Sequence, residues 1–303
     1  MFKKKEKQNN EAAQIEALGP WRIAFHRFKK NKIAVAGLIL FLIIVVMIIV
    51  VPMVSSYGLN DYNFEDAKLS PNAKYILGTD ASGRDIFTRL FLGGRISVLV
   101  GLIAAAVTVI VGSVIGGIAG FYGGKVDSFL MRISEIISSL PFTPLLIAIA
   151  STMVWVPSED KMYAVMALIG LLSWPGLARL IRGQILSLRE QEFMQACEAL
   201  GLSDSAKIFK HLLPNTLSII IVNATLQMAS AILTEAGLSF LGLGVSEPVP
   251  TWGNMANAAR TAEYFKDCPW MWLPAGIMIL LTVVSINLLG EGLRDAFDPK
   301  DIR

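Results

Sequence analysis

Six stretches of this sequence are long, mainly apolar and nearly free of Asp, Glu, Lys and Arg. A helix needs about 20 such residues to cross the hydrocarbon core of a bilayer. Because the core offers no water to backbone polar groups, we expect each stretch to be helical. The stretches are Ile33–Ser55, Ile96–Tyr122, Ile136–Val156, Met162–Ala178, Thr216–Gly244 and Trp270–Gly290. They predict an all-α integral membrane protein with six transmembrane helices.

The composition agrees with this prediction. Of the 303 residues, 54% are hydrophobic and only 17% are charged, whereas roughly one-quarter of the residues in a soluble domain are charged. The segment before the first stretch is too long and too polar for the basic region of a signal peptide. We therefore interpret the first stretch as a retained span.

The distribution of Lys and Arg predicts the orientation, because cytoplasmic loops of membrane proteins carry the excess of these residues. With the N-terminus inside, 19 of the 27 Lys and Arg residues fall on the cytoplasmic side and 8 on the other. Both termini and the polar segment 190–215 are thus predicted to be cytoplasmic. Residues 57–92 and 246–255 are predicted to be extracytoplasmic.

Glycine and proline positions predict how the spans pack. Gly112, Gly116 and Gly120 form a ridge of small residues at helical spacing, which lets another helix approach closely. Pro141, near the start of the third stretch, and Pro175, late in the fourth, are expected to kink or loosen their helices.

The segment Glu192–Asn215 is polar although it lies between two predicted spans. Its first part has an apolar stripe at helical spacing, formed by Phe193, Ala196, Cys197 and Leu200. Gly201 is suited to end this helix, and Ser203 or Asp204 can cap a second short helix. We expect Pro214 to end that helix. The pattern predicts a two-helix hairpin that rests on lipid or on the bundle, or that inserts into a cleft of a partner.

The hairpin resembles the EAA loop of the membrane subunits of bacterial ABC importers, where Glu-Ala-Ala is followed at fixed spacing by Gly and then Leu-Pro. The residues that match in register are Ala196, Gly201, Leu213 and Pro214. Gln195 stands where the family has its Glu, and Cys197 replaces the second Ala, while Glu192 and Glu198 lie nearby. The resemblance implies that residues 190–215 form a coupling loop that contacts a cytoplasmic ATPase.

Two further stretches resemble signatures of the peptide and nickel branch of these permeases. They are LGTDASGRDIFTRLFLGGRISVLVGL, Leu77–Leu102, and EAGLSFLGLGVSEPVPTWGNM, Glu235–Met255. The leader and first span resemble the extra N-terminal helix of the C-type subunit of paired oligopeptide and dipeptide permeases. With FYGGKVDSFLMRISEIISSLP and LLGEGLRDAFDP, the resemblance covers nearly the whole chain after the leader.

The resemblance implies the type I ABC importer (MetI-like) permease fold and half of a path for oligopeptides across a bacterial cell membrane. It implies as partners a second, homologous permease, two cytoplasmic ATPases that bind ATP and Mg, and an extracytoplasmic substrate-binding protein. A dipeptide or a nickel importer is the alternative within this branch. The implied division is 1–92 for leader, first helix and outer loop, 93–292 for the transmembrane domain, and 293–303 for a cytoplasmic tail.

The sequence offers no motif for bond-making chemistry. The Gly-Lys pair that begins at Gly124 is not followed by Ser or Thr, so it is not a phosphate-binding loop. His26 and His211 both lie outside the predicted bundle, which argues against a metal site. Ser239 lacks a nucleophile elbow and a His on the same side. We therefore predict no enzyme activity, no catalytic residue, no cofactor and no metal in this chain, and expect lipid and peptide rather than nucleic acid as ligands.

A few polar residues lie inside the apolar stretches. Glu235 is an acid within a span, which is a functional-site hypothesis by default. Its position near the outer end nevertheless favours a structural hydrogen bond. Asn223, Gln227 and Asn287 either line a polar path or join helices, since both uses need an amide that faces another helix.

The outer segments contain closely spaced charges. Asp80 with Arg84 and Asp85 with Arg89 have the i, i+4 spacing of ion pairs on a short, solvated helix. The resemblance adds a possible place for Asp80, Arg84 and Asp85 beside the binding protein. Trp252 is expected to anchor the chain at the outer membrane interface.

An ion-coupled secondary transporter is the alternative from a different class. Such a protein is expected to have paired ionisable residues near the middle of the membrane and two half-repeats with interrupted helices. Neither feature is found in the sequence, so the importer permease is preferred.

Overall fold

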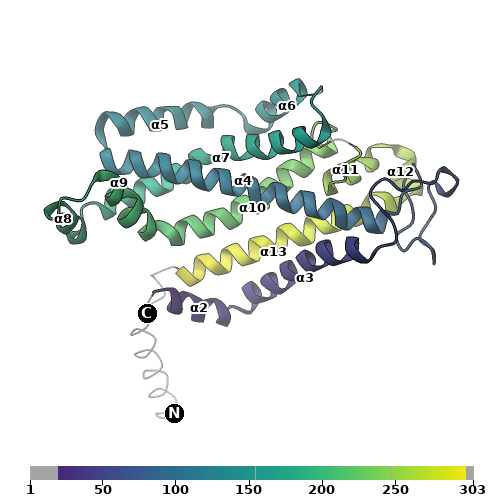
Figure 1. Ribbon diagram of the computed structural model, residues 1–303, viewed down its shortest axis with the longest axis horizontal. Helices are drawn as coiled ribbons and strands as arrows, with labels where there is room; N and C mark the ends of the chain where they lie inside the picture. The colour runs from purple at the N-terminus through teal and green to yellow at the C-terminus, as the bar shows by residue number, and fades with distance from the viewer. Residues whose placement is uncertain (1–19, 154, 246, 298–303) are drawn as a thin grey trace, which may run out of the picture.

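The computed structural model describes residues 20–153, 155–245 and 247–297 (Figure 1). Within these ranges all regular structure is helical, apart from one isolated bridge between Thr79 and Asp85. The long helices are α3 Lys32–Val54, α4 Ile86–Tyr122, α7 Ser158–Leu188, α10 Leu217–Phe240 and α13 Leu273–Phe297. The shorter segments are α2 Pro20–Lys30, η1 Phe64–Asp66, α5 Gly124–Ser139, α6 Phe142–Thr152, α8 Glu192–Ala199, α9 Asp204–Ala206, η2 Lys207–Leu212, η3 Leu213–Thr216, α11 Trp252–Ala256, η4 Asn257–Arg260, α12 Ala262–Asp267 and η5 Pro269–Met271. The all-α prediction is confirmed.

The described residues contain five helices that are long and apolar enough to cross a membrane, and a sixth candidate in two parts. The sixth is the pair α5 and α6, which bends by 81° at the break between them. Leu140 has extended backbone there, as expected for a residue that precedes proline. The predicted kink at Pro141 is therefore confirmed, and it divides the stretch Ile136–Val156 between two helices. In contrast, α7 continues through Pro175.

The predicted glycine ridge packs α4 directly against α7. A Cβ atom on Gly116 would lie 2.5 Å from the carbonyl oxygen of Ala178, and one on Gly120 would lie 2.9 Å from that of Arg182. These distances leave no room for a methyl group, so the two backbones are in direct contact. The pair of α4 and α7 forms the centre of the bundle.

The helix α3 contains a proline whose effect is compensated by a neighbouring helix. Pro52 has no N–H, so the carbonyl of Ile48, four residues earlier, lacks its usual partner. Arg95 on α4 supplies one, because its Nε donates to Ile48 O at 2.7 Å and its Nη2 donates to Ile49 O at 2.8 Å. This arginine thus joins α3 to α4 at a position where α3 is weakened.

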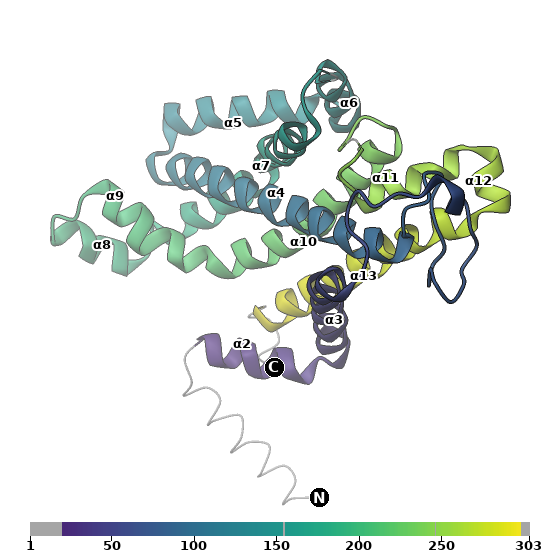
Figure 2. The ribbon, with the colours of Figure 1, turned by 45° about the vertical axis from the view of Figure 1, so that its right-hand side comes forward.

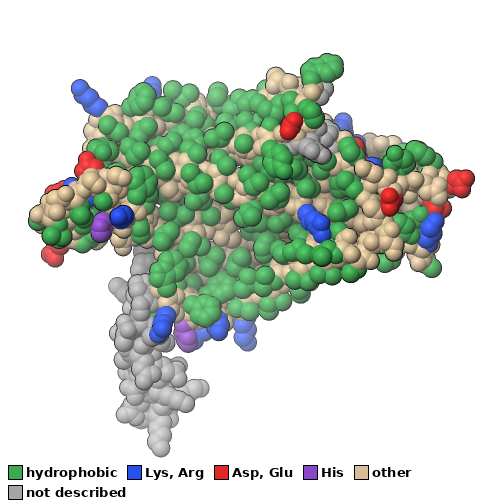
Figure 3. All heavy atoms as spheres, in the orientation of Figure 1, with side chains coloured by type: hydrophobic (Ala, Val, Ile, Leu, Met, Phe, Trp, Pro, Cys, Tyr) green, Lys and Arg blue, Asp and Glu red, His purple; other side chains and the backbone are tan. Residues whose placement is uncertain are grey.

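Polar segments gather at the two ends of the bundle. The hairpin end contains α8 and α9, with α2 and the last turns of α13 lying toward the same end (Figures 1 and 2). The loop end contains residues 57–85, α11 and α12. Hydrophobic side chains dominate the visible surface between the two ends (Figure 3). The chain therefore has the polar-apolar-polar arrangement of a protein embedded in a membrane.

Candidate functional site

The hairpin begins with α8 and turns at Gly201. The glycine has φ +67°, which a residue without a Cβ adopts at little cost. The hydroxyl of Ser203 accepts a hydrogen bond from Ala206 N at 3.4 Å and caps the next segment. The predicted turn and cap are confirmed.

The buried face of α8 differs from the predicted stripe. Met194 and Cys197 are buried, whereas Ala196 is exposed and Leu200 has 78% of its surface exposed. The helix ends at Ala199, so its periodicity does not extend to Leu200. The predicted stripe is therefore wrong at these two positions, and an apolar side chain lies on the outward surface of the hairpin.

The second arm of the hairpin does not stop at Pro214. It continues through η2, which is π-helical, and η3 into α10. Pro214 lies in the first turn of η3, directly after the π-helical segment. The expected helix end at Pro214 is wrong, because the chain stays helical from Asp204 to Phe240. Leu212 is buried and Leu213 is partly buried, so this arm is joined to the bundle without a flexible link.

Polar contacts join the two arms of the hairpin to each other and join the ends of α4 and α7 beside it. Lys207 Nζ lies 3.8 Å from Glu198 Oε1 and 3.6 Å from Asp204 Oδ1, and so connects both arms. Arg189 donates to the carbonyl oxygens of Gly120 and Phe121 at the end of α4, at 3.2 and 3.3 Å. Of the other predicted coupling residues, Glu192, Gln195, Gly201 and Pro214 are exposed. The hairpin therefore has an exposed outer surface, and its two arms are held together where they join the bundle.

The polar residues inside the spans have different surroundings. Glu235 is fully buried, accepts a hydrogen bond from Ser239 Oγ at 2.6 Å and lies 3.5 Å from Ser97 Oγ. Asn223 donates to Ile219 O of its own helix at 2.9 Å. Asn223 also lines a cavity of about 450 Å³ between α7, α10 and α13, which includes Arg294. Gln227 and Asn287 are partly buried.

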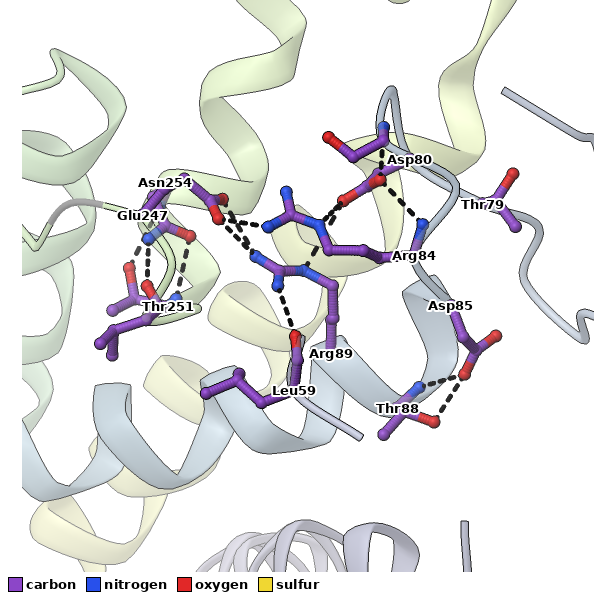
Figure 4. Close-up of polar contacts among 12 residues, drawn as sticks. Leu59, Thr79, Asp80, Arg84, Asp85, Thr88, Arg89, Glu247, Thr251 and Asn254 are labelled. Carbon is purple, nitrogen blue, oxygen red and sulfur yellow. Dashed lines mark hydrogen bonds and ion pairs between the residues drawn. The ribbon is translucent and has the colours of Figure 1, made fainter. Parts of the chain in front are cut away.

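A cluster of charges links two segments at the loop end (Figure 4). Arg84 Nε lies 2.6 Å from Asp80 Oδ2, which confirms that predicted pair. The predicted pair of Asp85 and Arg89 is wrong: Arg89 instead donates to both carboxylate oxygens of Glu247 at 3.0 Å. Arg84 Nη1 also donates to Glu247, at 2.7 Å. The charges are not on a solvated helix, because Arg89 has only 3% of its side chain exposed.

Asp85 caps a helix instead of forming the predicted ion pair. Its carboxylate accepts hydrogen bonds from the backbone N and the hydroxyl of Thr88, at 2.8 and 2.6 Å, and so caps α4. Trp252 is likewise not an interfacial anchor. It is fully buried, and its indole N–H donates to Leu90 O at 2.9 Å. The aromatic ring is part of the core that joins α11 to α4.

The sequence reasoning missed Glu247 and the buried position of Arg89. One signal was present, because Glu247 is the only acid between Glu235 and Glu263 and lies in a segment on the same predicted side as the outer arginines. The pairing of Arg89 with Glu247 depends on the path of the loop that follows α10, because this loop returns to the start of α4. The spacing of residues along the sequence does not show this path.

These features define an integral membrane protein with an exposed helical hairpin at one end and a partly buried cluster of charges at the other. The family described as the inner membrane component of binding-protein-dependent transport systems matches residues 112–302. The N-terminal transmembrane domain of oligopeptide transport permease C matches residues 19–71. The chain belongs to the family of binding-protein-dependent transport inner membrane components, with the MetI-like permease fold.

Curated relatives cover almost the entire chain. The dipeptide transport system permease of Alkalihalophilus pseudofirmus is 41% identical over 287 residues, which are 95% of this chain and 92% of the relative. The oligopeptide transport system permease of Bacillus subtilis is 39% identical over 94% of this chain and 91% of the relative. That of Haemophilus influenzae is 39% identical over 96% and 92%, respectively. Proteins of this family are membrane transport components, not enzymes, and work with an ATPase and a binding protein.

Proposed function

We propose that this chain is one of two different permease subunits in an ATP-driven importer of peptides, with oligopeptides as the preferred class. The similarity to oligopeptide and dipeptide permeases over more than nine-tenths of the chain supports peptide as cargo. The second permease, two cytoplasmic ATPases that bind ATP and Mg, and an extracytoplasmic binding protein complete the proposed assembly.

The hairpin of residues 190–215 is proposed to dock in a groove of one ATPase. The observation that carries this proposal is Leu200, an apolar side chain of the hairpin that is 78% exposed; Phe209 in the second arm is 45% exposed. An exposed apolar group between charged residues suits the centre of a protein interface, where burial stabilises the complex. The surrounding residues Glu192, Gln195 and Ala196 would lie at the rim of that contact.

The base of the hairpin is proposed to transmit movement of the ATPase to α4 and α7. A partner shifts a conformational equilibrium only if it binds the two states with different free energies. A flexible hairpin could follow the ATPase without moving α4 and α7, so the ATPase could not favour one state of the helix pair. Lys207 joins the two arms of the hairpin, and its Nζ lies 5.9 Å from the centroid of the Phe121 ring on α4. Arg189, which ends α7 directly before the hairpin, donates to Gly120 O on α4. These contacts favour movement of the hairpin with the helix pair.

The hairpin end is proposed to be cytoplasmic and the loop end extracytoplasmic. The excess of Lys and Arg on the side of the hairpin supports this orientation. We retain the proposed division into the leader with the first helix and outer loop (1–92), the transmembrane domain (93–292) and the cytoplasmic tail (293–303). Within the spans, we assign Glu235 to helix joining and retain Asn223, Gln227 and Asn287 as candidate path-lining residues.

Reconstitution of the purified assembly tests this function. The tagged chain is expected to copurify with a second permease and ATPases, and proteoliposomes with the binding protein should accumulate a labelled oligopeptide only with ATP and Mg. If the proteoliposomes accumulate a labelled dipeptide or nickel but not the oligopeptide, the proposed cargo is wrong. Accumulation by liposomes that contain this chain alone would disprove the proposed function.

A further inference from the structure

A charged cavity lies at the loop end of the bundle, away from the hairpin. Its volume is about 330 Å³, and its lining includes Asp80, Arg84, Arg89, Glu247 and Asn254. The guanidinium groups of Arg84 and Arg89 both contact Glu247 Oε2, at 2.7 and 3.0 Å, so the two cations lie next to each other (Figure 4). Two adjacent guanidinium groups provide a fork of donors that suits a carboxylate.

The two carboxylates of the cluster are held very differently. Asp80 is fixed by its own loop, because its Oδ1 accepts from the backbone N of Ser82 at 2.8 Å and of Arg84 at 3.0 Å. Glu247 comes from the loop after α10 and has 52% of its side chain exposed. Asp80 is therefore a permanent part of the site, whereas water and solutes have access to the carboxylate of Glu247.

Arg89 depends mainly on this accessible carboxylate. Its Nε lies 3.7 Å from Asp80 Oδ2, too far for a hydrogen bond, and its Nη1 lies 3.4 Å from Leu59 O. Its bonds to Glu247, both 3.0 Å, are shorter. A buried guanidinium requires an anion, but another carboxylate of the same geometry would satisfy it equally well.

We propose that this cavity is a carboxylate-exchange site, in which an Asp or Glu side chain of the docking binding protein displaces Glu247 from Arg84 and Arg89. The inference rests on the proposed function for the identity of the partner. Glu247 keeps the arginine pair neutralised while the partner is absent. Displacement releases the loop after α10, so that docking at the loop end is linked to the position of α10.

Glutarate, a small dicarboxylate, serves as the probe in a first experiment that needs no partner. The full chain in lipid nanodiscs is titrated with glutarate by calorimetry. Glu247→Gln removes the competing charge but keeps the shape, so binding should strengthen roughly tenfold, which is a typical value for one charged hydrogen bond. Adding Arg84→Gln to that variant should abolish the gain, while Arg89 is left unchanged because it is buried.

Glu263→Gln is the matched control. Glu263 also lies at the loop end and pairs with Lys68 at 2.7 Å, so its substitution changes the charge of the same region by the same amount. It should leave glutarate binding unchanged. Equal affinity in Glu247→Gln and the native chain, or an equal gain in both Gln variants, would overturn the exchange site.

A second experiment identifies the source of the carboxylate. In the assembled importer, Glu247→Gln should strengthen docking of the binding protein severalfold and Arg84→Gln should weaken it, with peptide affinity unchanged. If glutarate binds as predicted but docking does not respond, the partner in the proposal is wrong although the chain is still a permease. If only a peptide with a free C-terminus, and not its amide, responds to Glu247→Gln, the carboxylate is that of the cargo, which also contradicts the proposal.

Discussion

At the scale of single residues, backbone conformation and pairing decide which positions tolerate change. Gly201 has a positive φ and no atom within 4 Å of where its Cβ would be. Any effect of a substitution there comes from the backbone and not from crowding. Asp66, at the loop end, gathers hydrogen bonds from Lys74, Tyr75 and Asn63. These two positions allow direct predictions.

Gly201→Val should weaken the hairpin and uncouple ATP hydrolysis from transport. A β-branched residue with this φ costs about 1–2 kcal/mol, which favours a rearranged turn. Gly201→Asn is the matched control, because Asn tolerates the left-handed region. We expect ATPase activity without peptide uptake in the Val variant and near-normal coupling in the Asn variant, measured in proteoliposomes. Full coupling with Val would show that this turn geometry is not needed.

Acid should loosen the loop that contains Asp66. The hydrogen bond from Lys74, followed by those from Tyr75 and Asn63, lowers the pKa of the Asp66 carboxyl below its usual value. A lowered pKa stabilises the fold above the pKa of the unfolded chain, and this contribution is lost as the pH falls through the folded pKa. The protection factors of residues 63–80, which are the hydrogen-exchange rates of the unfolded chain divided by the observed rates at the same pH, should fall in that range. Asp66→Asn should make these protection factors insensitive to pH there; an unchanged acid response would refute the assignment.

At the scale of helices, small residues and compensating bonds determine which elements pack together. Gly116 and Gly117 are neighbours on α4, but only Gly116 faces the α7 backbone. Arg95 compensates for Pro52 across the contact between α3 and α4. Each feature can be tested with a variant and a matched control: Gly116→Ala with Gly117→Ala, and Arg95→Met with and without Pro52→Ala.

Gly116→Ala should destabilise the bundle, and Gly117→Ala should not. The new Cβ would lie 2.5 Å from Ala178 O in the first case and 3.4 Å from a side-chain atom of Ile208 in the second. Overpacking costs about 1–3 kcal/mol, whereas replacing Gly by Ala in a helix gains about 0.5–1 kcal/mol. Thermal unfolding in detergent should show a lower midpoint only for Gly116→Ala. Equal midpoints would contradict direct packing of α4 on α7.

Arg95→Met should destabilise the chain less when Pro52 is also replaced by Ala. In the native chain the substitution leaves the carbonyls of Ile48 and Ile49 without Arg95, at a cost of about 1–3 kcal/mol for an unsatisfied group. Pro52→Ala restores the N–H that Ile48 O lacks. The unfolding free energies of the single and double variants should therefore be non-additive. Strict additivity would show that Arg95 does not compensate for Pro52.

The sequence allowed these elements to be predicted to different degrees. The apolar stretches and the glycine ridge were predicted correctly because length and spacing alone determine them. The turn at Gly201 was also predicted, since φ > 0 favours glycine. The buried face of α8 and the partner of Arg89 were not, because they depend on which surface of α7 the hairpin meets and on where the loop after α10 returns.

At the scale of the whole molecule, the two ends perform separate tasks in the proposed importer. The hairpin follows α7 directly after Arg189, and its Lys207 contacts the Phe121 ring of α4. The loop end carries the charged cavity. The central helix pair α4 and α7 connects the two ends. Events at the ATPase and at the binding protein are therefore expected to influence each other through this pair.

Cross-linking tests whether the hairpin docks on the ATPase. In a chain with Cys197→Ala and Cys268→Ala, a single Leu200→Cys is labelled with a thiol-reactive benzophenone and irradiated in the assembled importer, and Ser70→Cys at the loop end is the control. We predict an adduct between Leu200→Cys and an ATPase subunit, and none from Ser70→Cys. The absence of an ATPase adduct at Leu200→Cys, or its formation at Ser70→Cys, would contradict the account.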